Sequence, residues 1–353
     1  MIADGGVSHF DVGASAKRTC NAKAHSHPRN TKLLDDAHIL LPPSSEMSRF
    51  EAVSFPTLDG LTLRGNLYPA SQRGPGIILL PGFSFIKEIM LPKVAEYFQK
   101  SGITALAYDP RTLGESDGSP RRDIDPTKHV SDLHDALTFL QKHPKVNPDQ
   151  IAYWGFSFNG VVALNAAALD KRAKCVIAVS PLADMSYPTE HLHALLRDAM
   201  KDREAQLAGA GPAYVPVVQK DGNCPYGWGP GTSINEYQVA EKSALVFPTY
   251  KNEMSIQSHY RISVWRPYDL IPQVAPTPVM IVTPTEDRMS PLKRQKALFD
   301  NLAMPKEHIL IPNKGHMDVL AGHGFESIMC GQIKFLSGNG EERVLGALKD
   351  DSG

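Results

Sequence analysis

The stretch YWGFSFNGVVALNAAA, residues 153–168, joins an apolar segment to a run rich in alanine. The apolar segment predicts a buried strand and the alanine-rich run predicts a helix, so Ser157 lies at the turn between them. Gly155 and Gly160 flank this serine, and a sharp strand-to-helix turn needs such small neighbours. A serine in this position is either a packing residue or an exposed nucleophile, and the rest of the chain decides between the two.

The composition of the 353 residues excludes several classes of protein. Hydrophobic residues make up 42% and the formal net charge is −1, which is ordinary for a globular chain and gives no basic surface for nucleic acid. No stretch approaches the ~18 apolar residues of a membrane span, and the N-terminus lacks a secretory pattern. Four scattered cysteines without a CxxC pair argue against a disulfide framework. We expect a cytoplasmic protein with no membrane or nucleic-acid partner.

Strand and helix patterns alternate along most of the chain. Residues 1–46 are polar and lack apolar periodicity, so we expect a flexible or disordered N-terminal extension, or a start codon placed too early. Two alternating strands follow around the turn signal Asp59-Gly60, and after them come short apolar runs separated by helical patterns. This order predicts a mostly parallel, doubly wound α/β sheet with helices on both faces.

The alternation fails between residues 184 and 268. This stretch combines one helical pattern with loop-rich segments, and an insertion of this size between two sheet strands predicts a cap, or lid. The core of the protein then consists of residues 47–183 and 269–340, followed by a flexible tail at 341–353.

Two later strand ends supply the partners that a nucleophilic serine needs. Asp287 follows the apolar run in VMIVTPTED, and His316 follows the next one in HILIPNKGH. His316 would remove the proton of Ser157 and later protonate the leaving group, while Asp287 would fix the imidazole tautomer and stabilise its charge. Ser157, Asp287 and His316 therefore form the predicted catalytic triad.

Alternatives to two of these assignments stay open. Glu286 is adjacent to Asp287, and Asp184 follows the apolar run CVIAVSPL, so either could be the acid. His323, in the stretch AGHGFE, is a weaker alternative to His316 because it lies beyond the strand end.

Two backbone amides can complete such a site by binding a developing oxyanion. The N–H of Phe158 lies at the start of the predicted helix, where the helix dipole favours negative charge. The N–H of Phe83, in PGFSFIKE after an early core strand, is the second predicted donor. We read Asp109 and Arg111, in YDPRTLGESDG, as loop-bracing residues rather than catalytic ones.

Motifs for metals and cofactors are missing from the sequence. It contains no HExxH, no phosphate-binding GxxxxGK[ST] and no dinucleotide-binding GxGxxG. His191 and His193 lie on a predicted cap helix and are interpreted as surface residues. We therefore expect neither a cofactor nor a metal site.

From Phe50 to Phe335 the chain resembles the α/β-hydrolases of fungal natural-product clusters, a group of polyketide transferases and related serine hydrolases next to dienelactone-hydrolase-like proteins. The likeness is carried by PGFSFIKE, YDPRTLGESDGSPRRDIDP, YWGFSFNG, YDLIPQVAPTPVMIVTPTEDRMSP and NKGHMDV. The strand, serine and helix then correspond to the nucleophile elbow of that fold. The chain departs from the pattern at Asn159, where the second glycine of the elbow usually stands. It also has NKGHMDV in place of Gly-Gly-His and TPTED in place of a glycine-containing acid loop.

The resemblance implies an α/β-hydrolase fold and a serine hydrolase or acyltransferase that acts on a small-molecule ester or thioester. The acyl group would be a polyketide-derived intermediate of fungal secondary metabolism, and an acyl carrier protein of a polyketide synthase would be a partner. A hydrolase-fold lyase or cyclase, or a small-ester hydrolase of the dienelactone type, is the alternative function.

Aromatic residues predict a large apolar pocket. Four phenylalanines flank the predicted oxyanion loop and elbow, and the cap contributes six further aromatic rings: Phe83, Phe85, Phe156, Phe158, Tyr214, Tyr226, Trp228, Tyr250, Tyr260 and Trp265. Ligand pockets are usually apolar with a few orienting polar groups, so a bulky acyl group is expected. The alternative is that these rings only join the cap to the body.

Overall fold

The computed structural model describes residues 50–228 and 234–337. The predicted N-terminal extension, residues 1–46, and the predicted tail, residues 341–353, lie outside these ranges.

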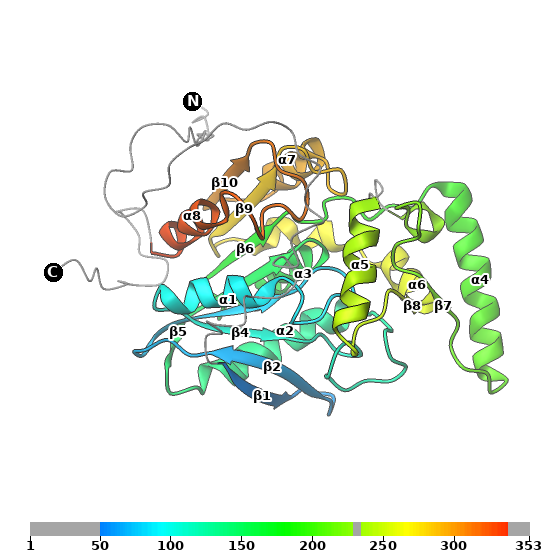
Figure 1. Cartoon of the computed structure of the whole chain (residues 1–353), viewed down its shortest axis with the longest axis horizontal. Coiled ribbons are helices and arrows are strands. Elements are labelled where there is room, and N and C mark those ends of the chain that lie inside the picture. Colours follow the sequence, from blue (N-terminus) through cyan, green and yellow to red (C-terminus); the bar gives the residue numbers. More distant parts are fainter. Residues whose placement is uncertain (1–49, 229–233, 338–353) are drawn as a thin grey trace.

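An eight-stranded sheet forms the centre of the molecule (Figure 1). The strands lie in the spatial order β1-β2-β4-β3-β5-β6-β9-β10. Strands β1 and β2 form the antiparallel hairpin expected around Asp59-Gly60, and β2 also runs antiparallel to β4. All the other neighbouring pairs are parallel. The mostly parallel, doubly wound sheet predicted from the sequence is therefore confirmed. The strands are β1 (Glu51–Pro56), β2 (Thr62–Tyr68), β3 (Gly74–Leu80), β4 (Thr104–Tyr108), β5 (Val146–Phe156), β6 (Cys175–Val179), β9 (Val279–Pro284) and β10 (Lys306–Ile311).

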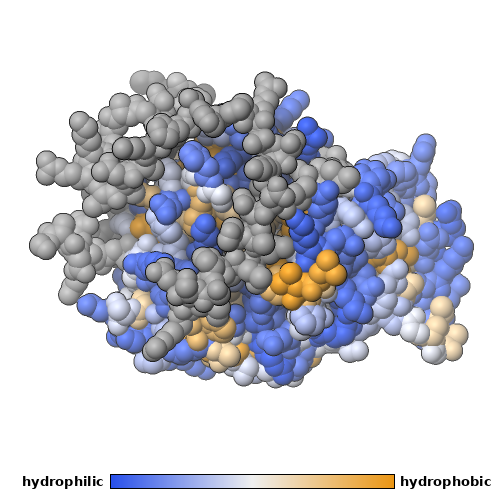
Figure 2. All heavy atoms as spheres, in the orientation of Figure 1, coloured by the Kyte–Doolittle hydropathy of each residue, from blue (hydrophilic) through white to orange (hydrophobic). Residues whose placement is uncertain are grey.

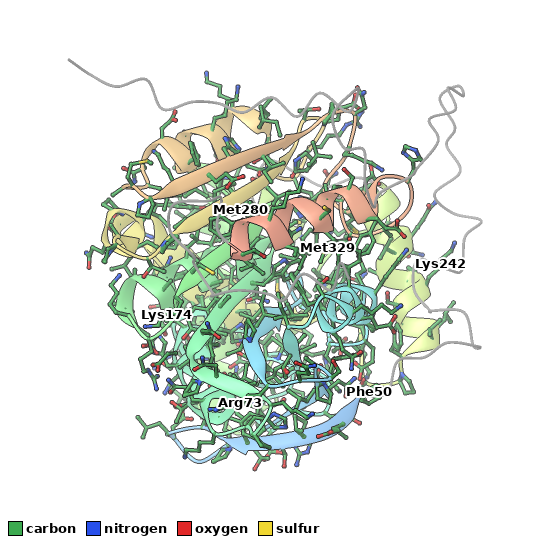
Figure 3. All side chains as sticks on the ribbon, turned by 90° about the vertical axis from the view of Figure 1, so that its left-hand side faces the viewer. Phe50, Arg73, Lys174, Lys242, Met280 and Met329 are labelled. Atoms are coloured by element: carbon green, nitrogen blue, oxygen red, sulfur yellow. The ribbon has the colours of Figure 1, made fainter. Side chains whose placement is uncertain are left out.

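Helices cover both faces of this sheet, because the central strands are apolar on both sides. One buried cluster joins the sheet to α2 (Pro126–Gln141), α3 (Phe158–Leu169) and α7 (Leu292–Asp300). The second cluster joins the opposite face to α1 (Leu91–Lys100) and α8 (Phe325–Ser337). Met280 of β9 and Met329 of α8 are both members of this second cluster (Figure 3).

The segment between β6 and β9 leaves the sheet and forms the elements at the right of Figure 1. These are α4 (Thr189–Leu207), β7 (Tyr214–Val215), the short helix η2 (Pro225–Gly227), α5 (Ile234–Val246), β8 (Met254–Ser255) and α6 (Ile256–Val264). The short helix η3 (Pro267–Val274) then packs against α3 and leads back to the sheet. We call residues 184–268 the cap. Hydrophilic side chains predominate on the face of α4 seen in Figure 2.

The loop after β4 holds the cap on the body. Arg261 of α6 pairs with Asp123 of that loop at 2.6 Å, and the Ser258 hydroxyl accepts a hydrogen bond from the Ile124 N–H at 2.7 Å. The Asn165 amide of α3 also donates to the Pro267 carbonyl at 3.1 Å. Polar contacts to two separate parts of the core thus hold the C-terminal part of the cap in place.

The turn from β5 into α3 is the most constrained backbone of the core. Ser157 has a φ of 57° and a ψ of −123°, a conformation that a residue with a side chain rarely adopts. A Cβ atom on Gly155 would lie 2.1 Å from the Asn159 carbonyl oxygen, so no side chain fits at this position. The close approach of strand and helix explains why the sequence has glycine two residues before the serine.

Gly155→Ala is expected to lower the free energy of unfolding by about 2 kcal/mol or more, because the new methyl group meets backbone that has to move. Gly211→Ala is the matched control, since a Cβ there meets no atom within 4 Å. Denaturant unfolding of the two variants measures the difference. Equal stabilities would show that the turn tolerates a side chain.

Candidate active site

The ends of β5, β9 and β10 bring the three predicted catalytic side chains together. The Ser157 Oγ lies 2.8 Å from Nε2 of His316, and Nδ1 of His316 lies 2.8 Å from Oδ2 of Asp287. Only 3% to 5% of the surface of each of these residues is exposed. The three groups form one continuous hydrogen-bonded chain, which is the geometry that moves a proton from a serine to an imidazole.

The orientation of Asp287 is fixed by two groups that sequence reasoning did not single out. The Ser290 N–H donates to one carboxylate oxygen at 2.8 Å, and the Gln295 amide donates to the other at 3.0 Å. Gln295 of α7 is itself fully buried and accepts a hydrogen bond from the Thr283 hydroxyl at 2.9 Å. In the sequence, the only sign of this contact is that Gln295 follows Asp287 by eight residues, on the next helix. This spacing indicates a contact only when the position of α7 relative to the acid loop is known.

The alternative candidates for the acid and the histidine are not part of this hydrogen-bonded chain. Asp184 accepts a hydrogen bond from the Ser186 N–H at 2.9 Å and pairs with Arg294 at 3.4 Å. Glu286 and His323 have exposed side chains. Of the candidates for the acid, Asp287 is the one in contact with His316.

Asn159 connects the serine turn to the predicted oxyanion loop. Its buried side-chain amide donates to the Pro81 carbonyl at 2.7 Å, and this carbonyl lies two residues before Phe83. Phe158 is the first residue of α3, so its N–H has no acceptor within the helix. Asparagine in place of the usual second glycine therefore has a structural reason: it holds the loop that contains Phe83 against the helix that begins at Phe158.

A buried ion pair also holds the predicted oxyanion loop, which follows β3, in place. Asp109, which is fully buried, accepts hydrogen bonds from the backbone N–H of Lys87 at 2.8 Å and from its ammonium at 2.9 Å. Burial by itself would lower the pKa of Lys87, but the negative charge of Asp109 and hydrogen bonds to Glu115 and Glu88 raise it above its ordinary value. Lys87 thus stays charged, and it fixes the loop to the end of β4.

Aromatic side chains from the cap contact the residues beside Ser157. The Trp228 ring lies 4.6 Å from that of Phe83, and the Trp265 ring lies 5.5 Å from that of Phe158. The rings of Phe83 and Phe158 are themselves 4.9 Å apart. These four rings, here called the aromatic roof, join the cap to the two residues predicted to supply the oxyanion amides.

Other predicted cap aromatics have different surroundings. Tyr250 contacts Phe85 at 5.8 Å between ring centroids. The Tyr214 hydroxyl donates to the Arg121 carbonyl at 2.8 Å, and the Tyr226 hydroxyl donates to Asp198 at 3.3 Å. Tyr214 thus joins the cap to the body, as the alternative interpretation of the cap aromatics expected, whereas Tyr226 links two parts of the cap itself.

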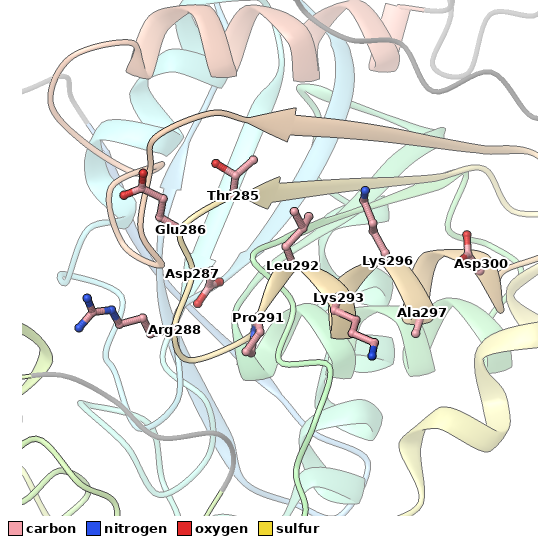
Figure 4. A pocket seen from close by; sticks show the side chains of 10 residues that line it. All are labelled: Thr285, Glu286, Asp287, Arg288, Pro291, Leu292, Lys293, Lys296, Ala297 and Asp300. Atoms are coloured by element: carbon pink, nitrogen blue, oxygen red, sulfur yellow. The ribbon is translucent and has the colours of Figure 1, made fainter.

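A surface cavity lies on the outer side of the acid loop and α7 (Figure 4). Its lining contains the charged side chains of Glu286, Asp287, Arg288, Lys293, Lys296 and Asp300, together with Thr285, Pro291, Leu292 and Ala297. Asp287, the predicted acid of the triad, thus also borders this cavity.

Within residues 50–228 and 234–337, no group of three or more His, Cys, Asp or Glu side chains is arranged to hold a metal ion. His191 and His193 lie on α4 with exposed side chains. Over the same ranges, none of the helices has the length and apolar character needed to cross a bilayer.

Comparison with known proteins agrees with this geometry. Residues 77–326 match a family model described as "Alpha/beta hydrolase family". The chain is 44% identical over 297 residues to a protein named "Thiohydrolase" from Eupenicillium brefeldianum, covering 84% of this chain and 96% of that protein. It is 46% identical over 288 residues to "Polyketide transferase ATR5" from Stachybotrys chlorohalonatus, covering 81% and 96%. The crystal structure of the alpha/beta hydrolase GrgF from Penicillium sp. sh18 superposes with a TM-score of 0.76 at 42% identity, covering 82% of this chain and 98% of that one.

Replacing Asp287 with Asn is expected to leave the chain folded and to lower kcat on a p-nitrophenyl ester by about 10⁴-fold, because the amide favours the wrong imidazole tautomer. Asp184→Asn is the matched control and should change kcat by less than about threefold, since Asp184 contacts Arg294 rather than His316. If the control lost more activity than Asp287→Asn, the acid would have to be reassigned.

Proposed function

The chain belongs to the alpha/beta hydrolase family, and we propose that it transfers an acyl group from an ester or thioester through a covalent intermediate on Ser157. Its activity is that of a polyketide thiohydrolase or transferase of fungal secondary metabolism. The observation that carries the mechanism is the continuous chain of hydrogen bonds from the Ser157 hydroxyl through His316 to Asp287.

Acylation starts when the Ser157 Oγ attacks the thioester carbonyl and Nε2 of His316 takes the hydroxyl proton. Asp287, bonded to Nδ1, stabilises the imidazolium that forms. The negative charge that develops on the carbonyl oxygen is held by the N–H groups of Phe83 and Phe158. The carbon–sulfur bond then breaks, and the thiol leaves with the proton from His316, so that an ester on Ser157 remains.

Deacylation repeats these steps with a different nucleophile. Water or an alcohol loses its proton to His316 as it attacks the Ser157 ester, and the serine leaves with that proton. Water gives the free acid and an alcohol gives a new ester. The aromatic roof favours acyl transfer to an alcohol to the extent that it keeps water away from the intermediate.

The aromatic roof supports a narrower proposal about the acyl chain of the substrate. Four aromatic rings beside the nucleophile offer apolar surface to a bulky, largely apolar acyl chain of polyketide origin. An acyl carrier protein would present such a chain as a thioester, and we propose it as the donor. The mainly hydrophilic outer surface of the cap is consistent with a chain that enters beneath it (Figure 2).

Longer acyl groups should react faster. Each buried methylene contributes about 0.8 kcal/mol, so a chain longer by four carbons is expected to raise kcat/KM by roughly a hundredfold. N-acetylcysteamine thioesters from acetyl to decanoyl provide the series, with thiol release as the measurement. A profile that is flat, or that falls from acetyl onward, would exclude the large pocket and favour a small-ester hydrolase.

A further inference from the structure

Two nitrogen atoms in the cap are buried without a hydrogen-bond partner among the described residues. They are Nε1 of Trp228, a residue 4% exposed, and Nε2 of His259, a residue fully buried on α6. Burial of an unpaired polar group is unfavourable, and in native proteins such groups are few. Two N–H-bearing nitrogen atoms in one ring cluster can pair with a polar group of a ligand.

The missing partner of His259 is not a general property of α6. Gln257, two residues before His259 on the same helix, donates to the Ala199 carbonyl at 2.8 Å and to Asp202 at 2.7 Å. Ser258 is also paired, with Ser255 and Ile124. The packing of α6 thus satisfies its other buried polar side chains and leaves Nε2 of His259 open.

His259 is held neutral and in a fixed orientation. Its Nδ1 lies 2.7 Å from the Tyr187 hydroxyl, and burial lowers its pKa to about 3. A neutral imidazole has one nitrogen that donates and one that accepts. When the Tyr187 hydroxyl donates to Nδ1, Nε2 carries the proton and becomes a donor, as Nε1 of Trp228 always is.

The two residues meet next to the proposed acyl site. The rings of Trp228 and His259 lie 6.2 Å apart and nearly perpendicular. Trp228 also contacts Phe83 and Phe158, at 4.6 Å and 6.3 Å, and these residues are the proposed oxyanion donors. The open nitrogen atoms therefore belong to the ring cluster that contains Phe83 and Phe158, the residues proposed to bind the oxyanion.

We propose that Trp228 and His259 bind an oxygen atom of the acyl chain, a keto or hydroxyl group away from the thioester, and so select oxygenated chains over plain aliphatic ones. A keto oxygen has two lone pairs and can accept from both N–H groups, while the surrounding rings contact the carbon chain on either side. This proposal rests on the proposed function, because it assigns the specificity of the same acyl site.

The test compares octanoyl N-acetylcysteamine thioester with its 3-oxo, 5-oxo and 5-hydroxy derivatives. We expect the wild-type enzyme to prefer at least one oxygenated chain by about tenfold in kcat/KM, the effect of one or two hydrogen bonds to neutral groups. Trp228→Phe removes one N–H while keeping an aromatic ring, and His259→Phe removes the other. In each variant the ratio of kcat/KM for oxygenated over plain chains should fall toward 1. His259→Gln retains a hydrogen-bond donor and should keep part of the preference.

Trp265→Phe is the control, since Trp265 also contacts the Phe158 ring but its nitrogen is not among the unpaired buried atoms. It should leave the preference ratio unchanged. Melting temperatures show whether His259→Phe folds, and if it does not, Trp228→Phe decides. A wild-type enzyme without preference, or variants that slow all substrates equally, would overturn the proposal. No turnover of any thioester would instead contradict the proposed function.

Discussion

The site depends on one constrained stretch of backbone, the turn that holds Ser157 at a φ of 57°. This conformation persists because the surrounding structure holds it from several sides. The Ser157 N–H donates to the Val179 carbonyl of β6 at 2.9 Å, and its carbonyl accepts from the Leu182 N–H at 3.1 Å. The Asn159 side chain then donates a hydrogen bond from the first turn of α3 to the predicted oxyanion loop. Ser157, the loop after β3 and the loop after β6 are thereby placed as one unit.

The opposite side of the site is built on α7 and the acid loop. Gln295 and Ser290 hold the Asp287 carboxylate, and Asp287 holds His316. The Ser290 hydroxyl also donates to the Pro181 carbonyl at 2.6 Å, which connects the acid loop to the segment that leads into the cap. Burial of this network lowers the local dielectric and strengthens each of its hydrogen bonds. A continuous set of hydrogen bonds thus connects Ser157 and His316 to Asp287, and the acid loop to the segment that leads into the cap.

Much of this arrangement could be predicted from the sequence because strand ends in a parallel sheet converge. The alternation of apolar runs predicted the sheet and placed Ser157, Asp287 and His316 at one edge. The sequence favoured Asp287 as the acid but left Asp184 open, because both follow strands; in the structure Asp287 contacts His316, whereas Asp184 pairs with Arg294. Contacts between distant segments, such as Trp228 with His259, could not be predicted either, because no local pattern encodes how the cap folds over the core.

The central claim is that acyl transfer proceeds through an ester on Ser157, and intact-protein mass spectrometry tests it most directly. After rapid mixing with a decanoyl thioester, the wild-type chain should gain the mass of one decanoyl group, located on the peptide that contains Ser157, and lose it on standing. Ser157→Ala should gain no such mass. A stable adduct on another residue, or turnover by the alanine variant at more than a few per cent of the wild-type rate, would contradict the account.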